Sequence, residues 1–186
     1  MKEALFLDRD GVINEDREDY VKSWPEFRFI PGVRSALKRL RKAGIPVVVI
    51  TNQSVIGRGM ITEKELSVIH ERMGNAVQKT GGLLQKIYYC PHHPGDRCRC
   101  RKPRIGLLKR AAKEMDLDLK KSIFVGDTLK DIQAGNRAGC RTLLVQTGQG
   151  KESLIKILSG KTRIRPDWVC DSLAAAIPLI LENFAP

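Results

Sequence analysis

The chain is short of aromatic residues, of acidic residues and of long apolar runs. Phe, Trp and Tyr make up 5% of its 186 residues, which leaves few rings on which the bases of single-stranded nucleic acid could stack. No apolar run approaches the roughly 20 residues that a membrane-spanning helix needs, and charged side chains in 1–11 interrupt any signal-peptide core. We therefore expect a cytoplasmic protein without a membrane anchor.

Basic residues outnumber acidic ones, 33 against 21, so the formal charge is +12. That charge suits a nucleic acid, an anionic membrane surface or a phosphorylated substrate, and equally a basic face that only keeps the protein soluble. The length fits one domain. Because no repeat or long linker divides the chain, we expect a single domain over 1–186, present as a monomer.

Short apolar runs alternate with helical patterns along the whole chain. This alternation predicts an α/β fold, a doubly wound parallel sheet with helices on both faces. In such sheets ligands bind beyond the carboxyl ends of the strands. The predicted strands are 4–7, 45–50, 86–89, 122–125, 141–145 and 167–169, and the predicted helices are 32–43, one that begins at Thr62, 105–115, 130–138 and 172–184.

Carboxylates follow two of these strands. Asp8 and Asp10 come after the first strand, and Asp127 comes after the fourth, with Asp131 one helical turn later. A single Asp at such a position is usually a helix cap or a turn residue. Several converging on one crevice repel one another unless a hard cation lies among them, and oxygen ligands of this kind suit Mg²⁺. The joint placement therefore predicts a magnesium site.

Two residues at the same edge could bind a phosphate. Thr51 ends the second strand and offers a hydroxyl and backbone N–H groups. Lys102 supplies a positive charge ahead of a helix, although its spacing alone does not distinguish it from a surface lysine.

The five cysteines are an odd number, and three of them lie within residues 90–100. In a reducing compartment such a group indicates a metal site rather than disulfides. Cys90, His92, Cys98 and Cys100 form a set that suits tetrahedral Zn²⁺, with His93 as a competing ligand and free cysteines as the alternative. These residues would form a zinc-binding loop inserted in the fold. Four protein ligands leave no open coordination position on the metal, so the zinc would be structural.

Joined together, the motifs resemble those of the haloacid-dehalogenase (HAD) phosphatases, in the same order. The finer pattern, from about residue 4 to residue 182, resembles the family of D-glycero-D-manno-heptose 1,7-bisphosphate 7-phosphatases. The motifs are Asp8-Arg9-Asp10-Gly11-Val12, Thr51-Asn52-Gln53-Ser54-x-x-Gly57-Arg58-Gly59, Tyr88-Tyr89-Cys90-Pro91-His92-His93-Pro94, Cys98-x-Cys100-Arg101-Lys102-Pro103, Gly126-Asp127-Thr128-x-x-Asp131 and Asp167-Trp168-Val169.

This resemblance implies a reaction and a role for each residue. Asp8 would be the nucleophile that forms an aspartyl-phosphate. Asp10 would be the general acid and then the general base, protonated at the start. Mg²⁺ would be held by Asp8, the backbone carbonyl of Asp10 and Asp127. Thr51 and Lys102 would hold the phosphoryl oxygens.

The resemblance also implies a small sugar bisphosphate as substrate. The intervals between motifs are short, so we expect no large cap domain. Asp131 would orient its neighbours rather than bind the metal. The predicted substrate contacts, besides Asp8, Asp10, Thr51 and Lys102, are Arg9, Asp16, Asp19, Asn52, Gln53, Ser54 and Arg101, the last toward a second phosphate.

Two alternatives stay open. The five residues between His92 and Cys98 look more like the spacing of histidinol-phosphate phosphatases. Thr128 also departs from the heptose pattern, since some heptose enzymes have Lys after the aspartate, which leaves open whether this position contacts the metal or the phosphate. The second alternative is of a different class: a basic zinc-containing nucleic-acid-binding protein, or a nucleic-acid end phosphatase. Its binding surface would be residues 97–104. The low aromatic content and the lack of a groove-binding helix motif weaken this alternative. We expect His70 to lie on a helix surface.

Overall fold

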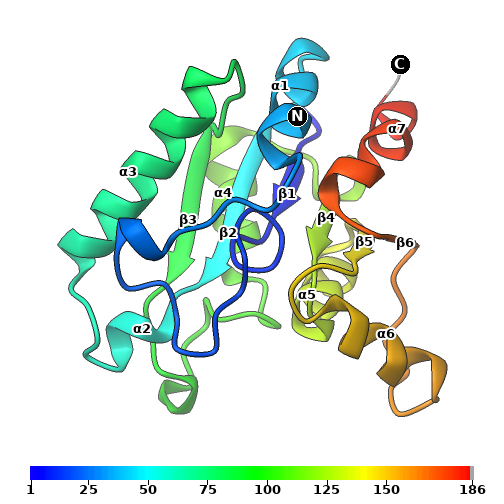
Figure 1. The fold of residues 1–186 in the computed structure, drawn as a ribbon. Coiled ribbons are helices and arrows are strands. Elements are labelled where there is room, and N and C mark those ends of the chain that lie inside the picture. Colours follow the sequence, from blue (N-terminus) through cyan, green and yellow to red (C-terminus); the bar gives the residue numbers. More distant parts are fainter. Residues whose placement is uncertain (185–186) are drawn as a thin grey trace.

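The computed structural model describes residues 1–184, and in that part of the chain six strands form one parallel sheet (Figure 1). Their order is β3-β2-β1-β4-β5-β6. The strands are β1 (Leu5–Leu7), β2 (Val47–Asn52), β3 (Lys86–Cys90), β4 (Ile123–Gly126), β5 (Arg141–Val145) and β6 (Trp168–Cys170).

Helices cover both faces of the sheet, so the predicted doubly wound α/β fold is confirmed (Figure 1). One face carries α1 (Val33–Lys42), α3 (Glu63–Lys79) and α7 (Leu173–Asn183). The other face carries α4 (Gly106–Met115) and α5 (Leu129–Ala138), with α6 (Gly150–Leu158) packed beside α5 and β5.

The central strands are buried on both faces because their side chains alternate between two apolar cores. Leu5 and Leu7 of β1 pack into the core under α1, α3 and α7. Phe6, between them, points to the opposite core, where its ring meets Phe124 of β4 edge to face at 6.5 Å. This burial explains why these strands are continuous apolar runs in the sequence.

The chain order reverses at β1, which pairs with β2 on one side and with β4 on the other. The backbone N–H of Asp8, just beyond β1, donates to the carbonyl of Val125 in β4 at 3.0 Å. The residues that follow β1 and β4 therefore lie together at the carboxyl edge of the sheet, where a doubly wound fold binds its ligand.

Two helices were not predicted: the single turn α2 (Ser54–Gly57) and α6. Strand β2 also runs to Asn52 rather than to residue 50, so Thr51 is the last but one residue of the strand and pairs with Tyr89. Residues 8–32 connect β1 to α1 and include only one 3-10 turn (Trp24–Glu26), and no large cap over the sheet edge is formed by the described residues 1–184. Within residues 1–184, none of the helices has the length and apolar character to cross a membrane.

Candidate active site

A buried lysine joins two carboxylates at the carboxyl edge of the sheet. The Nζ of Lys102 lies 2.9 Å from Oδ1 of Asp8 and 2.7 Å from Oδ1 of Asp131, and it donates to the carbonyl of Ile50 at 2.8 Å. Its side chain is 2% exposed, so it is not one more surface lysine. Asn52 fixes the Lys102 backbone, because its side chain accepts from the N–H at 3.0 Å.

Asp131 is held in place by the helix that carries it. Its Oδ2 accepts from the backbone N–H of Thr128 at 3.0 Å and from the Thr128 hydroxyl at 2.6 Å, the reciprocal cap at the start of α5. Its Oδ1 faces Lys102. Both oxygens of Asp131 are therefore occupied, and the hydroxyl of Thr128 serves the cap.

Asp127 differs, because one of its buried oxygens has no partner. Oδ2 accepts from the backbone N–H of Gln149 at 2.8 Å, whereas Oδ1 is buried without a hydrogen bond among the described residues. Gly11 and Gly148 have positive φ and lie so close that a Cβ at either would collide with this carboxylate. A buried, unpaired carboxylate oxygen is costly unless a cation occupies the remaining position.

The carboxylates of this cluster lie close enough to repel one another. One oxygen each from Asp8, Asp127 and Asp131 lie within 4.8 Å of one another. Burial raises the pKa of Asp8 to about 7, although Lys102 opposes the shift, and burial together with Asp131 and Asp8 raises the pKa of Asp127 well above its usual range. Divalent cations with oxygen ligands fit such a group.

The carboxylate of Asp10 lies in a different environment, surrounded by donors. Its Oδ1 accepts from Arg9 Nη2 at 2.8 Å and from Asn14 at 2.9 Å, and its Oδ2 accepts from Gln53 at 2.8 Å. Burial acts to raise the pKa of Asp10, but the ion pair with Arg9 and these hydrogen bonds outweigh it and hold the pKa below its usual value. These contacts favour the ionised carboxylate in the absence of substrate, and the role of Asp10 as a proton donor stays a prediction. Gln53 also donates to the hydroxyl of Thr51 at 2.9 Å.

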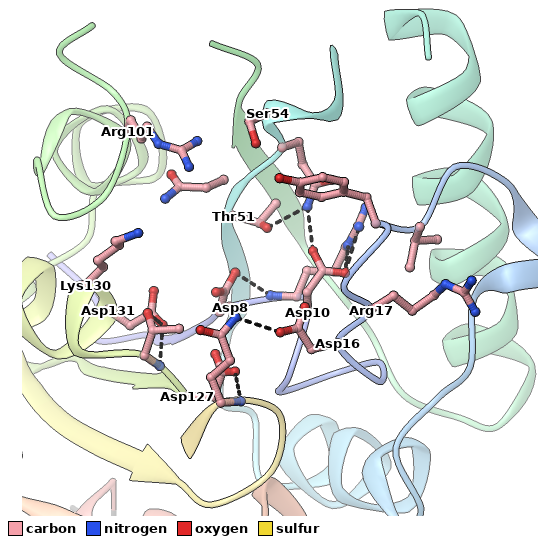
Figure 2. Close-up of a pocket in the computed structure, with 17 residues that line it drawn as sticks. Asp8, Asp10, Asp16, Arg17, Thr51, Ser54, Arg101, Asp127, Lys130 and Asp131 are labelled. Carbon is pink, nitrogen blue, oxygen red and sulfur yellow. Dashed lines mark hydrogen bonds and ion pairs between the residues drawn. The ribbon is translucent and has the colours of Figure 1, made fainter. Parts of the chain in front are cut away.

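A pocket of about 240 Å³ opens above these groups. Figure 2 shows Arg101 and Lys130 on one side of Asp8, and Asp10, Asp16 and Arg17 on the other. The predicted substrate contacts that line it are Asp8, Arg9, Asp10, Asp16, Thr51, Asn52, Gln53, Ser54 and Arg101. Arg17 and Tyr20, from the same loop as Asp16, also line it, as do Lys130 and Gln149, which were not predicted as contacts.

Asp19 lies outside the residues that line this pocket. Its exposed carboxylate pairs instead with Arg17 at 2.9 Å and with Lys22 at 2.7 Å. Lys102 does not line this pocket either, but its ammonium group contacts Asp8, which does. Lys130 carries no sequence signal beyond its place in the first turn of α5, beside Asp131.

The predicted zinc ligands also come together. Cys100 Sγ lies 3.1 Å from Cys90 Sγ and 3.2 Å from His92 Nδ1, and Cys98 Sγ lies 3.5 Å from Cys90 Sγ. These four donor atoms form one cluster. His93 is not part of it, because its Nδ1 accepts from the backbone N–H of Gly95 at 3.1 Å. Three sulfur donors and one nitrogen fit a tetrahedral metal.

His70 of α3 is buried against the site, so the expectation of a surface histidine is wrong. It is 8% exposed, and its Nε2 lies 3.2 Å from Nη1 of Arg9, itself 1% exposed. A signal for this was present in the sequence. Position 70 is four residues after Leu66 and three before Met73, on the apolar side of the helix.

Comparison with known families agrees with this geometry. The model of the haloacid dehalogenase-like hydrolase family matches residues 1–136, and a model described as HAD-hydrolase-like matches residues 99–176. The first match includes all the strand ends that carry the carboxylates and the lysine. The fold and the site thus define a hydrolase of the haloacid dehalogenase-like class.

Relatives define the family more closely. The chain is 42% identical over 180 residues to the D-glycero-β-D-manno-heptose-1,7-bisphosphate 7-phosphatase of Bordetella bronchiseptica, with 96% of this chain and 98% of the relative covered. It is 41% identical to the Pseudomonas aeruginosa protein of that name, with 97% and 99% covered. The chain belongs to this phosphatase family.

A solved structure supports the same assignment. The crystal structure of D,D-heptose 1,7-bisphosphate phosphatase from B. bronchiseptica, complexed with magnesium and phosphate, matches with a TM-score of 0.90 and 40% identity. The match covers 98% of this chain and 99% of that one.

Proposed function

We propose that this phosphatase hydrolyses the 7-phosphate ester of D-glycero-β-D-manno-heptose 1,7-bisphosphate through an aspartyl-phosphate on Asp8. The observation that carries the proposal is the buried contact of Lys102 with Asp8 and Asp131, beside the partly unpaired Asp127. The relatives that share about 40% of their residues with the chain carry this name, which favours the heptose substrate over histidinol phosphate and over nucleic-acid ends.

Asp8 has one oxygen free for attack. Both bonds that it accepts, from the backbone N–H of Arg9 at 2.7 Å and from Lys102 at 2.9 Å, are on Oδ1. We assign Oδ2, which has no hydrogen bond among the described residues, as the nucleophile. Its attack forms a bond to phosphorus and breaks the bond from phosphorus to the sugar oxygen. The ammonium of Lys102 and the hydroxyl of Thr51 stabilise the charge on the phosphoryl oxygens.

Asp10 moves the proton in both half-reactions. It donates a proton to the sugar oxygen as that oxygen leaves, and later takes a proton from the water that attacks the aspartyl-phosphate. The contacts of Asp10 with Arg9, Asn14 and Gln53 lower its pKa and so favour the ionised form, which the second step needs. A phosphate dianion that enters the pocket beside Asp10 raises its pKa, because like charges disfavour ionisation, and so favours the protonated form for the first step.

The residues present fit Mg²⁺. Asp8 and Asp127 would hold it with the backbone carbonyl of Asp10. The Oδ1 of Asp127, which is buried without a hydrogen bond among the described residues, is the oxygen that most clearly suits it. When bound, the ion neutralises charge between the carboxylates and the phosphate and orients the ester. The related structure that contains magnesium and phosphate supports this assignment. Asp131 would position Lys102 rather than bind the metal.

Cys90, His92, Cys98 and Cys100 fit a structural Zn²⁺. The metal would fix the position of the residues next to it in the chain, because Arg101 and Lys102 come directly after Cys100, the last of these ligands. The guanidinium of Arg104 also donates to the carbonyls of Arg97 and Cys98, which ties the loop to the start of α4. Zinc would therefore keep Arg101 and Lys102 in their positions at the pocket.

The second phosphate of the substrate would lie toward Arg101 and Lys130. Both side chains line the pocket on the side away from Asp10 (Figure 2). The planar fork of Arg101 suits a bidentate contact with phosphate oxygens. On the other side, Asp16 accepts from Gln149 at 2.8 Å and could meet sugar hydroxyls.

A comparison of kcat/KM with Mg²⁺ tests the substrate. The three compounds are the heptose 1,7-bisphosphate, histidinol phosphate and a 5′-phosphorylated oligonucleotide. We expect the bisphosphate to be preferred by at least about 100-fold, because histidinol phosphate has no second phosphate to place against Arg101 and Lys130 and the further phosphates of the oligonucleotide are diesters. A clear preference for histidinol phosphate or for the oligonucleotide would overturn the proposal.

A further inference from the structure

The carboxylate of Asp10 is oriented by a buried arginine, and that arginine is in turn fixed by a histidine from another element. Arg9 donates through Nη2 and Nε to Oδ1 of Asp10, at 2.8 and 3.3 Å. Its Nη1 lies 3.2 Å from Nε2 of His70, on helix α3. The three side chains therefore form a row from the helix to the pocket.

Burial makes each contact in this row matter. Arg9 is 1% exposed and His70 is 8% exposed, so neither side chain can exchange its partner for bulk water. A guanidinium group only donates hydrogen bonds. The Nε2 of His70 must therefore be the acceptor, and the ring is neutral with its proton on Nδ1.

The surroundings keep the ring in that form. Burial, and then the charge of Arg9, lower the pKa of His70 to about 3, against a smaller opposing effect of Asp10. The ring also meets Tyr89 of β3 at a centroid distance of 5.7 Å and an angle of 62°. The imidazole is thus held between helix and sheet with its acceptor nitrogen toward Arg9.

We propose that His70 is a positioning residue for the general acid and base: it fixes the guanidinium of Arg9 and thereby the orientation of Asp10. The inference rests on the proposed role of Asp10 in phosphate ester hydrolysis. Without the acceptor at Nε2 of His70, the buried Nη1 of Arg9 loses its hydrogen-bond partner, which is unfavourable. The guanidinium then turns to find another acceptor, and the carboxylate that it holds moves with it.

Three variants separate this role from packing. His70→Gln places an amide oxygen near the position of Nε2 and keeps the acceptor. His70→Leu fills a similar volume and removes it. Met73→Leu, one turn further along α3 and fully buried, is the matched control for a packing change on the same side of the helix that leaves the acceptor of Arg9 in place.

A comparison of two leaving groups distinguishes a positioning role from a purely structural one, because a structural defect would lower kcat/KM on both esters alike. Release of a sugar alkoxide needs a proton from Asp10, whereas release of 4-nitrophenolate does not, and kcat/KM reports the first half-reaction. For His70→Leu we expect kcat/KM on the heptose bisphosphate to fall about 10- to 100-fold, and kcat/KM on 4-nitrophenyl phosphate to change about threefold or less. His70→Gln should recover most of the loss, and Met73→Leu should match the wild type on both esters.

Equal losses on the two esters in His70→Leu, or a His70→Gln enzyme as impaired as His70→Leu, would overturn the inference. A wild type that does not hydrolyse the bisphosphate would instead contradict the proposed function. In that case the contact between Arg9 and His70 is tested by NMR, through the rate at which the Arg9 guanidinium protons exchange with solvent. They should exchange slowly with solvent in the wild type and in His70→Gln but not in His70→Leu, and equal exchange in all three would overturn the inference.

Discussion

The ammonium group of Lys102 lies 2.9 Å from the carboxylate of Asp8 although the two residues are 94 positions apart in the sequence and Lys102 is 2% exposed. The contact gives Asp8 a fixed orientation and leaves its second oxygen free. It also places a positive charge where phosphoryl oxygens would lie. The predictions below follow from this pair and from the groups that surround it.

Asp8→Asn should abolish turnover and leave the fold intact. The amide is not a nucleophile, so phosphate release should fall at least about 1,000-fold. Lys102 keeps its contact with Asp131, so thermal unfolding should occur near the wild-type temperature. Asp19→Asn, at an exposed carboxylate outside the pocket lining, is the control and should be fully active. A near-normal rate for Asp8→Asn would exclude Asp8 as the nucleophile.

Lys102→Met should lose both activity and stability. Removal of one partner from a buried ion pair leaves charges without compensation, at a cost of about 3–5 kcal/mol, and here two carboxylates lose their common cation. Urea unfolding measures the free energy change. Lys109→Met, on the exposed side of α4, should unfold like the wild type. If Lys102→Met were as stable as that control, the buried pair would not contribute to folding as described.

Removal of the loop metal should lower stability. Freshly purified protein should contain about one zinc per chain. Cys98→Ser should lower the melting temperature by at least about 5 °C, the shift that a loss of about 2 kcal/mol gives at this length. Cys140→Ser, at a buried cysteine outside the cluster, should keep its zinc. Metal analysis that finds no zinc in the wild type would remove the metal from the account.

His70 should make stability depend on pH below neutrality. Its pKa is about 3 in the folded chain and about 6.5 in the unfolded chain, so the unfolded state binds the proton first as the pH falls. Stability from the neutral ring is present above pH 6.5 and is lost below it, by about 2 kcal/mol between pH 7 and pH 5. His70→Gln removes this ionisation, so the wild type should lose that much more than the variant over the same interval. Parallel unfolding curves would mean that His70 titrates normally.

The sequence was sufficient for the parts of the site that depend on strand ends. Asp8, Thr51 and Asp127 follow or end buried strands, and parallel strands bring their carboxyl ends to one edge. The cluster at Cys90 and His92 could be predicted for a similar reason, since it is local and its donors are few. These predictions depend on the order of the strands and on local spacing in the sequence, and they do not require knowledge of side-chain contacts.

The parts that the sequence did not show depend on packing between distant elements. His70 was taken for a surface residue because polar residues usually face solvent, but its acceptor satisfies a buried arginine. The lowered pKa of Asp10 could not be predicted without its contacts to Arg9 and Gln53. Helix α6 was missed because Ile155 and Leu158 are exposed, at 63% and 77%, which blurs the periodicity of its apolar side.

The most direct test of the central claim is to follow the heptose 1,7-bisphosphate by ³¹P NMR in the presence of Mg²⁺ with the wild type and with Asp8→Asn. The account predicts that the wild type converts the signal of the phosphate at carbon 7 into inorganic phosphate while the signal at carbon 1 persists, and that Asp8→Asn converts neither. Loss of the phosphate at carbon 1 first, or equal conversion by both proteins, would contradict it.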